Sequence, residues 1–266
     1  MLQLIQSGAL FIGTLAGAIT DAKTGYIYDW ITYPMIILGV ILSIMQQQWM
    51  NLIAGAGIFV VLYITYKLGK LGGGDVKILA GIALLNPFND YIFLITLLFF
   101  AAMSAMIFYS AYYGVKYARK GINFKENKQG IQKAILFGAI LAAYFAALIS
   151  MGMIIAASAA IILIPLLFGL VFVALQKGIT KNFFEKKILL KQLEEDEVLA
   201  EERNNEKVQK LLRGKNLIGE KEKRILAKAG IKSIYVLRGL PPFAPFIFVG
   251  AVIALMQPSF LVFLFI

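Results

Sequence analysis

Two aspartates at the ends of apolar segments are the residues best placed to do chemistry. Asp21 closes the first apolar segment, and Asp75 follows a run of three glycines, Gly72, Gly73 and Gly74. Two carboxylates held close together share one proton, so that one acts as a base toward water while the other donates to a carbonyl oxygen. This chemistry hydrolyses a peptide bond without a metal ion or another cofactor. The pair therefore predicts an aspartic peptidase site, provided that the fold brings the two side chains together.

The residues around the two aspartates suggest supporting roles. The three glycines, which lack Cβ atoms, would let an extended substrate backbone approach closely, although a glycine-rich loop is also commonly just a turn. Lys23 and Lys77 each follow an aspartate by two residues, but that step on a helix turns away from the acid. The alternative is that both lysines extend toward lipid headgroups.

Each acid also has a structural interpretation. Asp75 suits the first turn of a helix, and Asp21 suits a membrane interface. Asp29 either orients the loop after the first helix or caps the second helix.

The composition excludes a soluble globular chain. Of the 266 residues, 60% are hydrophobic and 15% are charged, with a mean hydropathy of +0.78, whereas soluble chains are about 45–50% apolar and about 25% charged. The absence of cysteine and histidine excludes disulfides, a cysteine nucleophile, imidazole bases and cysteine- or histidine-based metal sites. The fold class is an all-α integral membrane protein.

Eight hydrophobic segments predict a polytopic helix bundle in which at least six segments span the membrane. The segment at 75–85 is too short to cross unaided. We expect no removable signal peptide, because no basic residue precedes the first segment. The clear segments are 2–20, 51–69, 91–115 and 152–176, and the weaker ones are 31–46, 75–85, 133–149 and 242–266.

The basic residues predict the orientation of the bundle. If all eight segments cross, all 26 Lys and Arg fall on one side, while the turns at 46–51, 86–90 and 150–152 carry none. By the positive-inside rule the basic side is cytoplasmic, which places both aspartates there and both termini outside. The net charge of +11 is thereby explained by the cell membrane and its lipids, and no nucleic-acid partner is predicted.

The segment 178–240 breaks the apolar composition and predicts a mainly helical cytoplasmic insert. We expect a helix from Asn182 to Arg213, interrupted near Asn204 and Asn205 and ended at Gly214. The insert is interpreted as a solvated cap, or alternatively as a dock for a substrate or partner. The expected organisation is a catalytic core at 1–115, a basic loop at 116–132, an additional helix pair at 133–177, the insert at 178–240 and a final helix at 241–266.

Three motifs resemble the GxGD aspartyl proteases of the type IV prepilin and preflagellin (prearchaellin) peptidase family, most closely its archaeal branch. The segment 21–30 resembles the first catalytic aspartate with its basic loop and a second Asp-aromatic pair. The segment 72–79, Gly-Gly-Gly-Asp-Val-Lys-Ile-Leu, resembles the GxGDxKLL element, with Gly73 in the variable place. The segment 239–246 is similar to the Gly-x-Pro-Phe-x-Pro start of the last helix in archaeal members.

The resemblance covers about residues 1–115 and 239–266. It implies that Asp21 and Asp75 are catalytic and that leader peptides are removed from pilin-like or archaellin precursors at the cytoplasmic membrane face. The chain departs from the smaller preflagellin peptidases by the additional hydrophobic pair, which leaves the substrate subclass open.

Three other interpretations remain at this stage. A presenilin-like or signal-peptide-peptidase-like enzyme would cut inside the membrane, and Tyr28-Asp29 superficially matches its Tyr-Asp motif. A proton-coupled transporter also uses membrane carboxylates, although neither aspartate here lies near the midplane. Finally, the helices could simply anchor the basic insert.

Overall fold

The structure is a computed structural model that describes residues 1–194, 197–212 and 215–263. The expected helix end at Arg213, the expected break at Gly214, the acidic residues Glu195 and Asp196, and the last three residues of the final segment lie outside the described residues.

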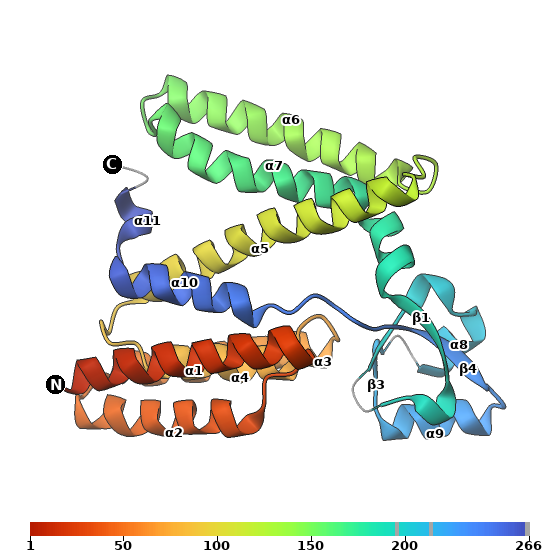
Figure 1. Cartoon of the computed structure of the whole chain (residues 1–266), viewed down its shortest axis with the longest axis horizontal. Coiled ribbons are helices and arrows are strands. Elements are labelled where there is room, and N and C mark those ends of the chain that lie inside the picture. The colour runs from red at the N-terminus through yellow and green to blue at the C-terminus, as the bar shows by residue number, and fades with distance from the viewer. Residues whose placement is uncertain (195–196, 213–214, 264–266) are drawn as a thin grey trace.

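The membrane part is built from helices that run back and forth between two ends of the bundle (Figure 1). Five of the described helices, α1, α3, α5, α6 and α7, are long and apolar enough to cross a membrane, and α2 and α10 are shorter apolar helices. The prediction of an all-α polytopic membrane bundle is confirmed. The helices are α1 (Leu2–Thr24), α2 (Asp29–Met45), α3 (Trp49–Lys67), α4 (Gly73–Leu84), α5 (Tyr91–Lys120), α6 (Lys128–Ser150), α7 (Ala156–Ile179), α10 (Ala244–Met256) and α11 (Phe260–Phe263).

The short helix α4 runs antiparallel to α1 through the middle of the bundle. Its twelve residues rise about 18 Å, which is less than the roughly 30 Å of a hydrocarbon core. Just beyond the end of α4, buried polar side chains form hydrogen bonds with one another and with the backbone. Asn51 donates to the carbonyl of Asn86 at 2.7 Å and to Gln48 at 3.0 Å, and Gln6 donates to Gln48 at 2.7 Å. Because Gln6 lies near the start of α1, the end of α4 reaches the N-terminal end of the bundle.

The main apolar core surrounds α4. Ile78, Ile82 and Leu85 are almost completely buried, and they belong to one cluster with residues of α1, α2, α5 and α10. Helices α6 and α7 form an outer layer, in which α6 packs on α7 and α7 packs on α5 (Figure 1). The candidate site therefore belongs to the inner helices, and the additional pair lies at the periphery.

The insert is not the long helix expected over 182–213. After α7 the chain makes a π-helical turn, η1 (Thr180–Phe184), and then forms a four-stranded antiparallel sheet in the order β1-β4-β2-β3. The elements are β1 (Glu185–Leu189), the 3-10 turns η2 (Leu190–Gln192) and η3 (Glu201–Arg203), β2 (Glu197–Leu199), α8 (Glu206–Leu212), β3 (Leu217–Ile218), α9 (Glu220–Lys228) and β4 (Ser233–Leu237).

The physical reason for the sheet is a period-two pattern that pairs residues far apart in the sequence. In β4, Ile234 and Val236 are buried while their neighbours are only partly covered, and Ile188 of β1 stands opposite Ile234. Buried β-branched residues in alternation favour a strand over a helix. Together with Leu212 and Leu226 they form a core of the insert's own.

The insert contacts the loops that flank both aspartates. The hydroxyl of Tyr26, in the loop after α1, donates to Glu194 at 3.3 Å, and burial together with the charge of Glu194 raises the pKa of Tyr26. Gly69, in the loop before α4, lies beside Asn216: a Cβ added at Gly69 would stand 3.5 Å from it. The insert thus lies at the end of the bundle that carries both aspartates.

Candidate active site

Asp21 stands in the last turn of α1 and is buried, with 7% of its surface exposed. The helix ends immediately afterwards at Gly25, which adopts a left-handed conformation (φ 73°) and donates its N–H to the carbonyl of Asp21. Glycine takes this conformation without steric cost, so it commonly ends helices. The sequence therefore stops α1 one turn after the carboxylate.

Asp75 stands in the first turn of α4 and folds back toward the residue before the helix. Its carboxylate accepts a hydrogen bond from the N–H of Gly72, which confirms the expected helix-start role. A Cβ added at Gly72 would stand 2.9 Å from Oδ2 of Asp75, so glycine makes room for the carboxylate. The other oxygen, Oδ1, is buried and has no hydrogen-bond partner among the described residues.

The fold brings the two carboxylates together. The charge of Asp21 acts directly on Asp75, and α1 and α4 touch close by: a Cβ added at Gly17 would come within 2.6 Å of Ile78. Gly17 lies one turn before Asp21, and Ile78 lies just after Asp75. The small residue in α1 therefore sets the close approach of the two helices beside the carboxylates.

The segment before α10 forms the third side of the site. The N–H of Ala244 donates to Oδ2 of Asp21 at 2.9 Å, and Phe243 provides a second backbone hydrogen bond. These are unpaired N–H groups at a helix start, where partial positive charge favours a carboxylate. The resemblance drew attention to this segment, but sequence reasoning gave it no contact with Asp21.

Tyr109 of α5 is a site residue that sequence reasoning missed. Its hydroxyl donates to the carbonyl of Pro242, and its ring packs edge-on against Phe246 with centroids 5.0 Å apart. Tyr109 is also close enough to interact electrostatically with Asp21 and Asp75. Tyr109 thus holds the segment that donates to Asp21. Its position inside an apolar helix is the only signal that the sequence offered, and five other tyrosines or phenylalanines between 99 and 113 share that position.

Lys77 and Asp29 pair with each other and not with the two candidate acids. Lys77 pairs with Asp29, with Nζ 2.5 Å from Oδ1, and lies over the ring of Tyr33. It therefore turns away from Asp75, as its two-residue spacing implied. Asp29 does not cap α2, because Tyr28 is the capping residue and no side-chain hydrogen bond is made there. The ion pair instead ties the start of α2 to α4, and Lys23 is exposed.

Two of the three glycines have a demonstrable packing role. A Cβ at Gly74 would stand 2.8 Å from Cβ of Ile27, so the glycine lets the loop after α1 lie against α4. Gly72 accommodates Asp75, as described above. Gly73 has more space, since the nearest atom to an added Cβ is a ring carbon of Tyr66 at 3.4 Å.

The geometry is therefore a carboxylate pair with unequal surroundings, in which Asp21 is buried and Asp75 is partly buried. Asp21 accepts two backbone N–H groups, whereas Asp75 accepts one and keeps a buried oxygen that has no partner within the described part of the chain. Such a pair can hold one shared proton and activate a water molecule. Among the described residues, no three Asp, Glu, His or Cys side chains group in a way that could hold a metal ion.

Comparisons with known proteins point to the same region. Residues 8–111 match the type IV leader peptidase family. The prepilin peptidase EppA of Methanothermobacter thermautotrophicus is 33% identical over 100 residues, a match that covers 34% of this chain and 26% of that protein. The chain thus matches only about a quarter of the length of this relative, and no solved structure matches it. Asp21 and Asp75 both lie inside residues 8–111, the part of this multi-pass membrane protein that is similar to the type IV leader peptidase family.

Proposed function

We propose that this chain is an aspartic endopeptidase that removes leader peptides from pilin-like or archaellin precursors at the cytoplasmic face of the membrane. The observation that carries the proposal is the pair of buried Asp21 and partly buried Asp75 within a region that matches the leader peptidase family. The prepilin peptidase similar to this chain supports the substrate class.

The unequal surroundings of the two acids suggest their roles. Hydrogen bonds from backbone N–H groups stabilise the charged form of a carboxylate. Asp21 accepts two of them and Asp75 only one, so Asp21 is the ionised partner and Asp75 carries the shared proton. Asp21 takes a proton from a water molecule, whose oxygen adds to the carbonyl carbon of the scissile bond. Asp75 donates its proton to the carbonyl oxygen. Asp21 then gives its proton to the leaving nitrogen, the C–N bond breaks, and Asp75 takes back a proton from the hydroxyl as the carboxyl group forms.

The substrate reaches the pair from the polar side, past the start of α4. Gly72 is exposed, and without a side chain its backbone admits an extended peptide close to Asp75. Gly73 also belongs to this path, because a small side chain there would find space. Gly74 serves packing against Ile27 instead.

The test is to incubate membranes that contain the native chain with several pilin and archaellin precursors. The expected result is one cut, found by N-terminal mass analysis, between the basic leader and the apolar helix. A cut within the apolar helix would indicate an intramembrane protease instead. If correctly inserted protein cut none of the precursors, the proposal would fail.

A further inference from the structure

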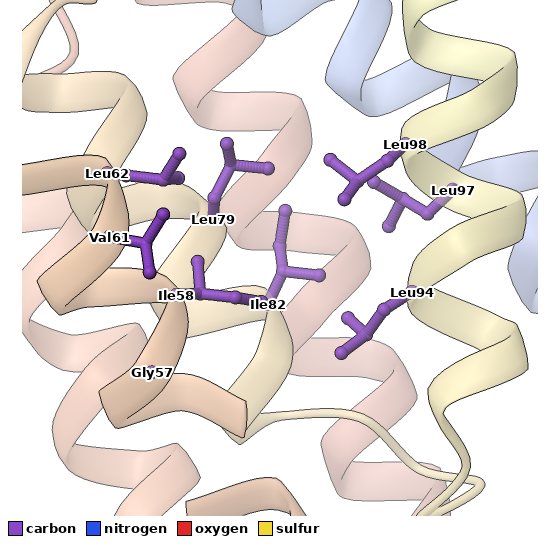
Figure 2. A pocket seen from close by; sticks show the side chains of 9 residues that line it. All are labelled: Gly57, Ile58, Val61, Leu62, Leu79, Ile82, Leu94, Leu97 and Leu98. Atoms are coloured by element: carbon purple, nitrogen blue, oxygen red, sulfur yellow. The ribbon is translucent and has the colours of Figure 1, made fainter. Parts of the chain in front are cut away.

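An apolar groove lies between three helices on the membrane side of the candidate site. It has a volume of about 260 Å³, and every lining residue is apolar. Figure 2 shows Ile58, Val61 and Leu62 of α3 on one side, residues of α5 on the other, and Leu79 and Ile82 of α4 between them. The α5 side consists of Leu94, Leu97 and Leu98.

The groove continues the face of α4 that carries Asp75. Leu79 and Ile82 follow Asp75 by four and seven residues, so the three side chains project from one face of the helix. At 1.5 Å per residue, the groove begins about 6 Å deeper than the carboxylate and continues to about 10 Å. The groove thus begins about one helical turn beyond Asp75 on the same face of α4 and extends into the apolar part of the bundle.

The groove needs an apolar occupant. An apolar cavity of this size that stays empty loses packing contacts along its whole lining. It opens outward, because Val61 at its edge is 61% exposed. Helix α3 packs mainly on α4 and barely on α5, so its outer wall is free to receive another helix in the way that an amphipathic or apolar helix fills a groove.

We propose that this groove binds the first turns of the apolar helix of the precursor, immediately after the scissile bond. This inference rests on the proposed function, in which the cut lies directly before such a helix. A peptide bond at Asp75 then places the following helix about one turn deeper, where Leu79 forms the floor. The groove sets the register: it fixes how far into the membrane the helix starts, and hence which bond meets the carboxylates.

A crosslinking experiment tests the groove without requiring cleavage. The Asp75→Asn chain carries a photoreactive phenylalanine derivative at Val61, or at Ile37 of α2 as a control. The two positions are similarly exposed, 61% and 58%. The probe is a synthetic precursor with a basic leader and an apolar helix of about 20 residues. We expect crosslinks from position 61 to the first turns of the probe's helix, and few or none from position 37.

A groove-filling variant adds a matched pair. A Cβ built at Gly57, which lines the groove, meets nothing within 4 Å, and the same holds for Gly8 of α1, outside the groove. Both positions therefore have room for the first carbon of a side chain, and leucine favours the helix over glycine at both. We expect Gly57→Leu to lower crosslinking from position 61 about tenfold, and Gly8→Leu to leave it unchanged.

The outcomes separate the two proposals. If the native chain cuts the probe but position 61 crosslinks only to lipid, or equally with Gly57→Leu, the groove is a lipid site and this inference is wrong while the peptidase stands. If the crosslinks form as expected but the native chain cuts nothing, the helix site stands and the proposed peptidase fails.

Discussion

At the residue scale, the candidate site depends on a tyrosine that holds backbone in place. Tyr109 fixes the carbonyl of Pro242, and two residues later the N–H of Ala244 donates to Asp21. If Asp21 is the base, its charge depends on that N–H group remaining in place. Tyr109 is therefore a positioning residue, since it acts on Asp21 through the segment before α10.

Tyr109→Phe should lower kcat for leader removal about two- to tenfold, because one hydrogen bond worth roughly 0.5–1.5 kcal/mol is lost. KM should stay nearly unchanged, since the ring and its packing remain. Tyr112→Phe, on the same helix with a half-exposed ring, is the control and should keep native kcat. A rise in KM at constant kcat for Tyr109→Phe would contradict the positioning role.

At the element scale, the start of α4 is held by the close contact between Gly74 and Ile27. Gly74→Ala places a Cβ 2.8 Å from Cβ of Ile27 and 3.2 Å from the carbonyl oxygen of Ile27. We expect a loss of 1–3 kcal/mol of stability from overpacking, read as a lower midpoint of thermal unfolding in detergent, together with lower activity.

Gly73→Ala is the matched control for this contact, because its nearest neighbour is a side-chain ring atom at 3.4 Å. It should unfold at nearly the native temperature. Equal destabilisation by both substitutions would show that the glycine run acts through backbone freedom and not through packing on Ile27.

The sequence predicted some elements and missed others for physical reasons. Long apolar segments identify membrane helices, because within the hydrocarbon core a single segment can pair its backbone N–H and C=O groups only by forming a helix. The helix start at Asp75 was readable from its glycine run. The sheet of the insert was missed, since its strands are two to five residues long in a charged region, and β1 pairs with β4 across more than forty residues.

The contacts of the candidate site were less predictable than its acids. That Asp21 and Asp75 lie at one end of the bundle followed from counting crossings. The pairing of Lys77 with Asp29 and the reach of Tyr109 to Pro242 depend on how helices rotate against one another, which one sequence does not specify. The sheet could have been predicted from segment 233–237, in which the apolar β-branched residues Ile234 and Val236 occupy every second position, as in a strand.

At the scale of the whole molecule, the insert and the two carboxylates lie at the same end of the bundle. Both chain connections of the insert lead into the site region. The connection before it follows α7, which packs on α5, and the ring of Phe184 there lies 4.9 Å from that of Tyr113 in α5. The connection after it runs from β4 through residues 238–243 into α10. If the insert faces the cytoplasm, so do Asp21 and Asp75.

Because the chain contains no cysteine, single cysteines can report this orientation. Lys125→Cys, between α5 and α6, should react with a membrane-impermeant maleimide only after the cells are opened. Met151→Cys, in the exposed turn after α6, should react in intact cells. The two positions flank one helix, so the reverse pattern would invert the orientation and place the carboxylates outside.

The central claim is that Asp21 and Asp75 together cut the precursor, and single substitutions in membranes test it most directly. Asp21→Asn and Asp75→Asn keep the size of each side chain but cannot share a proton as two acids do. Asp90→Asn, at the capping residue of α5 near the opposite end of the bundle, is the control. Leader removal should be lost in both site variants, with inserted protein at native levels, and should persist in Asp90→Asn. Native cleavage by either Asp21→Asn or Asp75→Asn would contradict the account.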